Sequence, residues 1–153
     1  MKQKINKISF LDLKSLHEPI RLLLDEAYAR VMDSGWFIMG PELEAFESEF
    51  ASYCEVKQCI GVANGLDALH LLLRANDIGD GDEVIVPANT FIATWLAVSQ
   101  TGAKPIPVEP DIKTYNIDAS KVGSAITKKT RAIIPVHLYG QPVDMDPINE
   151  LAS

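Results

Sequence analysis

The chain has 153 residues, of which 47% are hydrophobic and 23% are charged, and 21 acidic against 14 basic side chains give a formal net charge of −7. An apolar content this high excludes a disordered chain. The acidic balance argues against a nucleic-acid-binding protein, whose affinity depends on Lys and Arg. No apolar run approaches the roughly 18 residues of a membrane span, and no signal peptide begins the chain, so we expect one cytoplasmic domain that does not contact membranes.

The first part of the chain predicts two helices. From Ser15 to Asp33, apolar residues recur at the spacing of an amphipathic helix, and Ser15 with Glu18 fits a capping box at its start. Pro41 opens a second helix, because proline is favoured at the first helical position. The apolar face of this second helix carries Leu43, Phe46 and Phe50.

Further along, short apolar runs alternate with segments of helical period. The runs are Cys59–Ala63, Val84–Val86, Pro105–Val108 and Ala132–Val136. The helical segments between them are Asp67–Arg74, Thr90–Gln100 and Asp118–Ile126. Alternating strands and helices are typical of βαβ units, in which helices cover both faces of a parallel sheet. The sequence therefore predicts a three-layer α/β domain preceded by two helices.

A candidate phosphate-binding turn lies at Asn64–Asp67, between a predicted strand and the start of a helix. Gly65 is expected to let the backbone turn tightly, which leaves the amides of Leu66 and Asp67 as unpaired donors for an anion. The segment is neither a GxGxxG motif nor a Walker loop. The alternative is an ordinary turn followed by an acidic first-turn residue.

Two other predicted strand ends carry candidate ligand-binding side chains. The ring of Phe91 at one of them is placed to stack on a flat heteroaromatic ligand, although a buried core position is the commoner role for phenylalanine. His137, Tyr139 and Gln141 follow the last predicted strand. A histidine there is either an acid–base group or a residue hydrogen-bonded to the backbone.

The cysteines indicate neither a metal site nor a redox pair. Cys54 and Cys59 lie five residues apart, which fits neither a CxxC motif nor a common zinc spacing. We therefore expect two reduced thiols. No cluster of His, Cys and carboxylate residues has the spacing of metal ligands, so no metal is expected.

Six spaced segments occur in one order along the chain: Ser34–Glu47, Asn64–Leu69, Gly81–Pro87 with Thr90 and Phe91, Gly102–Pro105, Thr114–Asp118, and Pro135–Gly140. Together they resemble the DegT/DnrJ-type sugar aminotransferases. The resemblance covers the chain from Phe10 onward. Several motifs in the right order are far more specific than any one of them.

The resemblance implies a pyridoxal 5′-phosphate (PLP)-dependent transferase of fold type I, which is the aspartate aminotransferase-like fold. Residues 1–153 would be its N-terminal part, an incomplete large domain with leading helices. The implied activity transfers an amino group from an amino acid, with glutamate expected, to a nucleotide-linked keto-sugar in deoxyamino-sugar or cell-surface polysaccharide biosynthesis. The turn at Asn64–Leu69 looks most like the branch that aminates C3 of dTDP-linked 3-keto-6-deoxyhexoses.

Carried over to this sequence, the resemblance places the cofactor phosphate on the amides of Leu66 and Asp67 beside Gly65, and the pyridine ring against Phe91. It implies a homodimer in which the neighbouring subunit completes each active site. The family's Schiff-base lysine is expected beyond Ser153, so the 153 residues alone are expected to lack transaminase activity. The alternatives are a non-catalytic module that binds PLP or a sugar nucleotide, and an inactive fragment.

Overall fold

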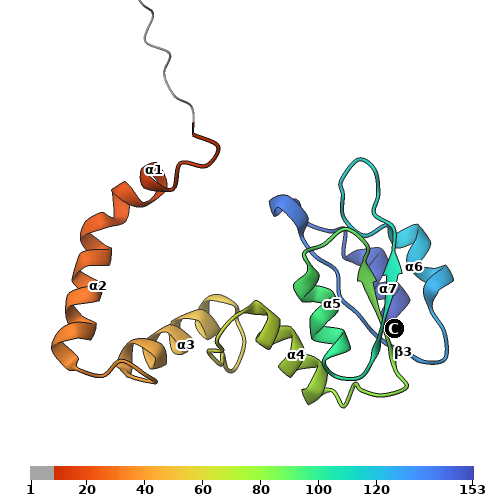
Figure 1. The fold of residues 1–153 in the computed structure, drawn as a ribbon, viewed down its shortest axis with the longest axis horizontal. Coiled ribbons are helices and arrows are strands. Elements are labelled where there is room, and N and C mark those ends of the chain that lie inside the picture. The colour runs from red at the N-terminus through yellow and green to blue at the C-terminus, as the bar shows by residue number, and fades with distance from the viewer. Residues whose placement is uncertain (1–8) are drawn as a thin grey trace, which may run out of the picture. The chain divides into compact units, whose positions relative to one another are not determined.

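The structure is a computed structural model that describes residues 9–153 (Figure 1). It divides the chain into two compact units, with the boundary between Gly61 and Val62, where the length alone suggested one domain. Within residues 9–153, no helix combines the length and the apolar character needed to cross a membrane.

The N-terminal unit contains α1 (Leu13–His17), the short 3₁₀ helix η1 (Glu18–Ile20), α2 (Arg21–Ser34) and α3 (Pro41–Tyr53). The expected capping box at Ser15 is wrong, because α1 starts earlier and Asp12 is its N-cap, accepting a hydrogen bond from the Ser15 amide at 3.2 Å. The single predicted helix is also interrupted, since Pro19 has no N–H and its ring disfavours a continuous α-helix.

The connection from α2 to α3 follows the sequence signals. Gly35 ends α2 in a left-handed conformation with φ 64°, and Pro41 is the first residue of α3, as predicted. An ion pair joins the two helices, with Arg30 Nε 2.9 Å from Glu42 Oε1. Ala51 is the one buried residue of these helices, so the predicted apolar faces remain exposed within this unit.

The C-terminal unit alternates helices and strands, as predicted. Its elements are α4 (Gly65–Ala75), β1 (Glu83–Pro87), α5 (Ile92–Ser99), β2 (Lys104–Val108), α6 (Ala119–Ala125), β3 (Thr130–Ile133), the 3₁₀ helix η2 (Leu138–Gly140) and α7 (Asp146–Ala152). The strands are parallel and ordered β2-β1-β3. Ile85 in the central strand pairs with Ile106 on one side and Ile133 on the other.

Each face of β1 has its own hydrophobic core, because successive side chains of a strand point to opposite faces. Val84 and Val86 pack with buried residues of α4 and α5, including Leu73 and Val98. Ile85 packs on the other face with Val122 of α6 and Ile148 of α7, among others. The predicted α/β architecture, with helices on both faces of a parallel sheet, is confirmed.

Two strand predictions need correction. Cys59–Ala63 forms no strand, because a strand needs a paired neighbour, and the amide of Gly61 instead donates to Glu47 Oε1 at 2.6 Å. The run predicted at Ala132–Val136 ends early, since β3 stops at Ile133 and Pro135 has no N–H to offer a ladder. The expectation of reduced cysteines is confirmed, since Cys54 and Cys59 are both free thiols.

Ile85→Ala tests the central position of β1. The side chain is fully buried on the face that packs against α6 and α7. We expect the free energy of unfolding to fall by about 2–5 kcal/mol, because the truncation leaves a cavity. Urea denaturation measures the change. Ile112→Ala, at an exposed position, is the matched control and should stay within about 0.5 kcal/mol of the parent protein.

Candidate functional site

The carboxyl ends of the three strands define the edge of the sheet where a ligand is expected. The chain leaves this edge in three loops, which follow β1 at residues 88–91, β2 at 109–118 and β3 at 134–145. In Figure 1 the strand arrows point toward these loops at the top of the C-terminal unit. The candidate residues Phe91, His137 and Tyr139 all belong to these loops.

The start of α4 presents free backbone donors. Asn64 is the N-cap, and its Oδ1 accepts a hydrogen bond from the Asp67 amide at 2.9 Å. Its Nδ2 donates to Asp67 Oδ2 at 3.0 Å. The amides of Gly65 and Leu66 have no acceptor among residues 9–153. Of the two amides expected to bind phosphate, that of Leu66 is therefore open and that of Asp67 is occupied by Asn64.

Gly65 does not have the backbone role that the sequence suggested. It is the first residue of α4, and it is absent from the glycines with positive φ, which are Gly35, Gly81, Gly102 and Gly140. The expectation of a tight glycine turn is therefore wrong. A Cβ built at Gly65 would meet no heavy atom within 4 Å. Neither backbone conformation nor packing requires glycine here, which leaves open space beside the free amides.

The start of α5 lies at the same edge as the start of α4. The chain passes from the carboxyl end of α4 to the start of β1, and from the end of β1 to the start of α5. Both helices therefore run in the direction opposite to the strand. They pack side by side, with His70 Nδ1 3.4 Å from the carbonyl oxygen of Ala97 near the middle of each helix.

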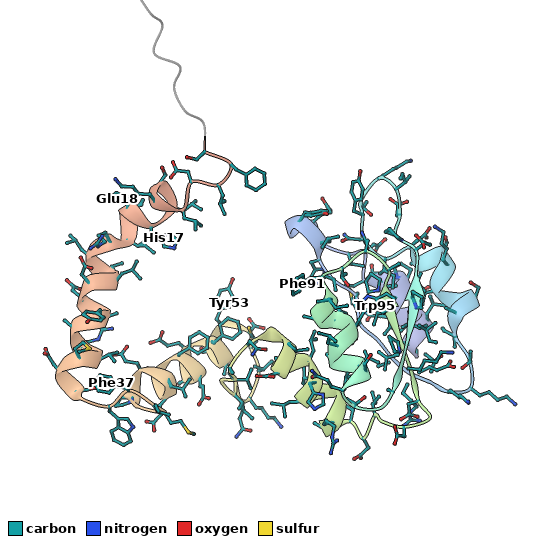
Figure 2. The ribbon with its side chains drawn as sticks, viewed as in Figure 1. His17, Glu18, Phe37, Tyr53, Phe91 and Trp95 are labelled. Atoms are coloured by element: carbon teal, nitrogen blue, oxygen red, sulfur yellow. The ribbon has the colours of Figure 1, made fainter. Side chains whose placement is uncertain are left out.

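Phe91 is the N-cap residue of α5, and the residue is 79% exposed (Figure 2). The buried core role that is commoner for phenylalanine is therefore not the one observed. The neighbouring Trp95 fixes the start of the helix, because its Nε1 donates to the carbonyl oxygen of Pro87 at 3.2 Å. The structure thus presents an uncovered aromatic ring at the end of the central strand.

Two asparagine side chains that the sequence did not single out tie the three loops together. Asn116 is only 4% exposed; its Nδ2 donates to the carbonyl oxygens of Gln141 at 2.9 Å and Pro142 at 3.1 Å. Its Oδ1 accepts from the Leu138 amide at 3.0 Å. Asn89 Nδ2 donates to the carbonyl oxygen of Tyr115 at 3.0 Å. No local pattern distinguishes these residues from ordinary turn asparagines.

His137 is hydrogen-bonded to the backbone, which confirms one of the two interpretations open from the sequence. The Val143 amide donates to His137 Nδ1 at 2.9 Å. Because Nδ1 is the acceptor, the neutral ring carries its proton on Nε2. Tyr139, two residues further on, is largely exposed and meets the ring of Tyr115 edge to face.

Charged groups near this edge serve the local loop structure. The amides of Thr114 and Lys113 each donate to Asp111 Oδ1 at 2.9 Å, and these bonds hold the pKa of the Asp111 carboxyl below its ordinary value of 3.8. Asp118 caps α6, and its hydrogen bonds from Ser120 and Lys121 lower its pKa as well. Within residues 9–153, no group of three or more His, Cys, Asp or Glu residues is arranged to hold a metal ion.

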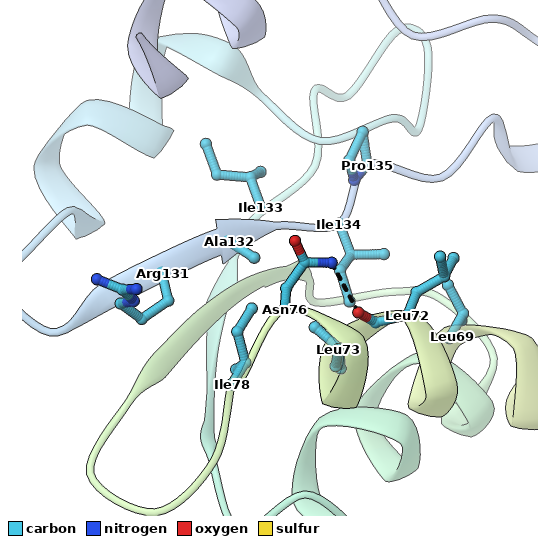
Figure 3. Close-up of a pocket in the computed structure, with 10 residues that line it drawn as sticks. All are labelled: Leu69, Leu72, Leu73, Asn76, Ile78, Arg131, Ala132, Ile133, Ile134 and Pro135. Atoms are coloured by element: carbon cyan, nitrogen blue, oxygen red, sulfur yellow. Dashed lines mark hydrogen bonds between the residues drawn. The ribbon is translucent and has the colours of Figure 1, made fainter.

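A cavity of a different character lies beside β3 (Figure 3). Its volume is about 470 Å³, and it lies between α4 and the open edge of β3. Its lining residues are mostly apolar: Leu69, Leu72, Leu73, Asn76, Ile78, Arg131, Ala132, Ile133, Ile134 and Pro135. The amide of Asn76 is already bonded, with Nδ2 2.8 Å from the Leu72 carbonyl oxygen. This groove offers packing surface rather than acid–base groups.

Comparison with known proteins gives consistent matches. The model of the DegT/DnrJ/EryC1/StrS aminotransferase family matches residues 21–153. A dTDP-3-amino-3,4,6-trideoxy-α-D-glucose transaminase of Streptomyces venezuelae is 57% identical over 147 residues, which are 96% of this chain and 39% of the relative. A dTDP-3-amino-3,6-dideoxy-α-D-galactopyranose transaminase of Aneurinibacillus thermoaerophilus is 57% identical over 146 residues, which are 95% of this chain and 40% of the relative. The chain thus spans about 40% of the length of these relatives.

Solved structures agree with the sequence matches. Streptomyces venezuelae DesV, in complex with a ketimine intermediate, superposes with a TM-score of 0.90 at 57% identity. The superposed part is 95% of this chain and 39% of the DesV chain. NtdA from Bacillus subtilis, with bound cofactor PMP, has a TM-score of 0.88 at 38% identity. The superposed part is 99% of this chain and 35% of the NtdA chain. The arrangement of helices and strands described above is therefore the arrangement of aminotransferases of known structure.

The hydrogen bonds to Asp111 give a pH prediction for the loop after β2. The pKa of Asp111 is lower in the folded state than in the unfolded state. Its contribution to stability is therefore fully present when the pH is above the unfolded-state pKa, and it is lost as the pH falls through the folded-state pKa. We expect the Asp111 carboxyl to titrate below 3.8 in an NMR titration. Asp111→Asn keeps an acceptor oxygen and should remove this titration while preserving the loop. A midpoint at or above 3.8 would contradict the assignment.

Proposed function

This chain belongs to the DegT/DnrJ/EryC1/StrS aminotransferase family, and on that premise we propose that the whole protein transfers an amino group from an amino acid, glutamate, to a nucleotide-linked keto-sugar. The observation that carries the proposal is the 57% identity, over nearly the whole chain, to two relatives named as transaminases of dTDP-linked 3-amino sugars. A relative named for a UDP-linked substrate is 45% identical. We therefore propose C3 of a dTDP-linked 3-keto-6-deoxyhexose as the position aminated.

The cofactor of this proposal is PLP, and the residues at the edge of the sheet fit it. The free amides of Gly65 and Leu66 at the start of α4 suit a phosphate dianion, since a helix N-terminus favours negative charge. The open space beside Gly65 leaves room for that group. The exposed ring of Phe91 suits stacking on the pyridine ring.

The contact expected from the Asp67 amide requires a local change. That amide is bonded to Asn64 Oδ1, so it becomes available to a phosphate only if the Asn64 side chain rotates away. The Asp67 carboxylate stands in the same turn and would repel a phosphate, and its hydrogen bond from Asn64 Nδ2 moderates that charge. We therefore assign the phosphate first to the amides of Gly65 and Leu66.

Each residue of the site then has a separate task. The amides at the start of α4 hold the phosphate, and Phe91 fixes the plane of the pyridine ring. Asn116 and Asn89 hold the surrounding loops in place. The cofactor itself supplies the electron sink that stabilises negative charge on the substrate carbon. The lysine that binds it covalently is assigned, by resemblance, to the part of the family's length that these 153 residues do not span.

We also propose that the whole protein completes this domain, adds a smaller C-terminal domain and works as a homodimer. β3 is an edge strand in the described sheet, and an apolar groove runs beside it. The N-terminal unit exposes large apolar side chains, including Leu13, Leu16, Leu23, Phe46 and Phe50. Exposed apolar surface on this scale is typical of an interface.

The direct test uses the whole protein supplied with PLP, glutamate and a dTDP-linked 3-keto-6-deoxyhexose. We expect the visible absorbance of bound PLP, formation of 2-oxoglutarate, and a dTDP-linked 3-amino sugar detected by mass spectrometry. Bound PLP without amino transfer to any nucleotide-linked keto-sugar would overturn the enzymatic proposal in favour of a binding module. Absence of PLP binding would overturn both the enzymatic proposal and a module that binds PLP.

Gly65→Val tests the cofactor position. A branched side chain would fill the open space beside the free amides and crowd the phosphate, so we expect PLP affinity to fall about tenfold or more, the loss that accompanies a charge-assisted hydrogen bond. Absorbance titration with PLP measures the affinity. Gly123→Val is the matched control, because a Cβ at Gly123 makes only an ordinary contact of 3.6 Å with Leu151. Unchanged affinity in Gly65→Val would remove Gly65 from the site.

A further inference from the structure

The central strand β1 ends in a carbonyl group that β3 does not reach. On this side of β1, the Ile134 amide donates to the carbonyl oxygen of Ile85 at 2.9 Å. Backbone groups of alternate strand residues point to the same side, so the carbonyl of Pro87 is the next acceptor in that direction. β3 ends at Ile133, and Pro135 has no N–H to offer, so the ladder stops before Pro87.

Two side chains that follow in the chain supply donors to this carbonyl. Pro87 is fully buried, and a buried carbonyl left without a donor is costly. Trp95 Nε1 donates to the Pro87 carbonyl oxygen at 3.2 Å, and Thr90 Oγ1 makes a longer contact of 3.5 Å. The indole is therefore the main donor. It joins the first turns of α5 to the end of β1, across the loop that contains Phe91.

The ring of Phe91 depends on this loop for its position. The residue is 79% exposed, so burial does not hold the ring. Phe91 lies midway along the chain between Pro87 and Trp95, the two residues that the hydrogen bond joins (Figure 2). Closing so short a segment limits the directions in which the ring can point. A side chain that contacts a ligand is held precisely only when neighbouring groups fix it in this way.

One hydrophobic core supports both this loop and the start of α4. Trp95 is half-buried and packs against the core that contains Val86 and Val98. Leu66, whose amide is one of the proposed phosphate donors, packs against the same core. The indole therefore holds the loop of Phe91 to the same packed side chains that hold the start of α4.

We propose that Trp95 is a positioning residue for the cofactor: its indole N–H, bound to the Pro87 carbonyl, sets the orientation in which Phe91 stacks on the pyridine ring. The inference rests on the proposed function, which puts the PLP phosphate at the start of α4 and the pyridine ring against Phe91. Stacking depends on the offset and angle of the two rings, so a loop that shifts loses part of the contact. Trp95 itself does not touch the cofactor and acts only through Phe91.

Trp95→Phe in the whole protein tests this role, because it keeps an aromatic ring against the core and removes the N–H. We expect PLP to bind about threefold to tenfold more weakly in an absorbance titration, the loss that accompanies one hydrogen bond. We also expect a smaller visible circular dichroism signal from bound PLP at saturation, because that signal depends on how the pyridine ring is oriented. A merely structural role would lower stability without changing this signal.

A double variant shows whether Trp95 acts through Phe91. Phe91→Ala removes the stacking ring, and we expect it to weaken PLP binding about tenfold. Adding Trp95→Phe to Phe91→Ala should cause no further loss of PLP affinity, because the ring that the indole orients is then absent. Independent contributions would instead multiply in the double variant.

Ile148→Val is the matched control, since it alters a buried side chain in the core on the other face of the sheet. Its loss of stability in urea should be similar to that of Trp95→Phe, while PLP affinity stays at the parent value. Parent-like PLP affinity or circular dichroism in Trp95→Phe, or losses that multiply in the double variant, would overturn the inference while leaving PLP binding and amino transfer by the parent protein intact. A parent protein that does not bind PLP would overturn the cofactor of the proposed function, and the inference with it.

Discussion

The central strand β1 determines the position of every other element in the C-terminal unit. Val84, Ile85 and Val86 are fully buried, two facing one core and one facing the other. A strand buried on both faces must be covered by helices on both sides, and a parallel neighbour can be reached only through a crossover. These constraints direct α4 and α5 to one face and α6 and α7 to the other. They also bring the loops after the three strands to a single edge.

At that edge, polar side chains hold the loops to one another. The loops after β2 and β3 bury Ile117 and Val143 in one hydrophobic core. Hydrogen bonds from Asn89 and Asn116 to backbone groups of other loops then determine how the loops lie against one another. A buried amide whose donors and acceptor are all satisfied holds its partners in one arrangement, because breaking the network would strand polar groups away from water. The loops of the candidate site are consequently held in one arrangement by the chain itself.

The helices of the N-terminal unit are determined by local signals more than by packing. They begin and end at an N-cap aspartate, a glycine and a proline, and they bury almost no side chains within the unit. Helices with exposed apolar faces contribute little stability by themselves, since most helical stability in proteins comes from packing. The proposed dimer, and the remainder of the family's length, are the partners we assign to this surface.

Much of the architecture could be predicted from periodicity, because burial on one or two faces imprints a pattern on the chain. The strands around Val84, Ile106 and Ala132 and the helices between them were predicted within a few residues. The strand predicted at Cys59–Ala63 was wrong. The composition of this segment suits a strand, but a strand forms only beside a neighbouring strand, which the local sequence does not specify. The predicted start of the first helix, with Ser15 as its cap, was wrong because the N-cap is Asp12. Asp and Ser are both favoured N-cap residues, and local preference alone does not choose between them.

By itself, the sequence determined the family, the alternation of strands and helices, and the two segments that begin α4 and α5, since all of these depend on residue order along the chain. Only the tertiary structure decided how those segments are used. It showed that Gly65 is helical, that the Asp67 amide is occupied, that Phe91 is exposed, and that Asn116 locks two loops together. The helical Gly65 and the occupied Asp67 amide follow from a local contact, because Asn64, three residues before Asp67, is the N-cap of α4. The exposure of Phe91 and the contacts of Asn116 depend instead on which surfaces the packed layers leave uncovered and on residues distant in the chain, and no local pattern encodes either.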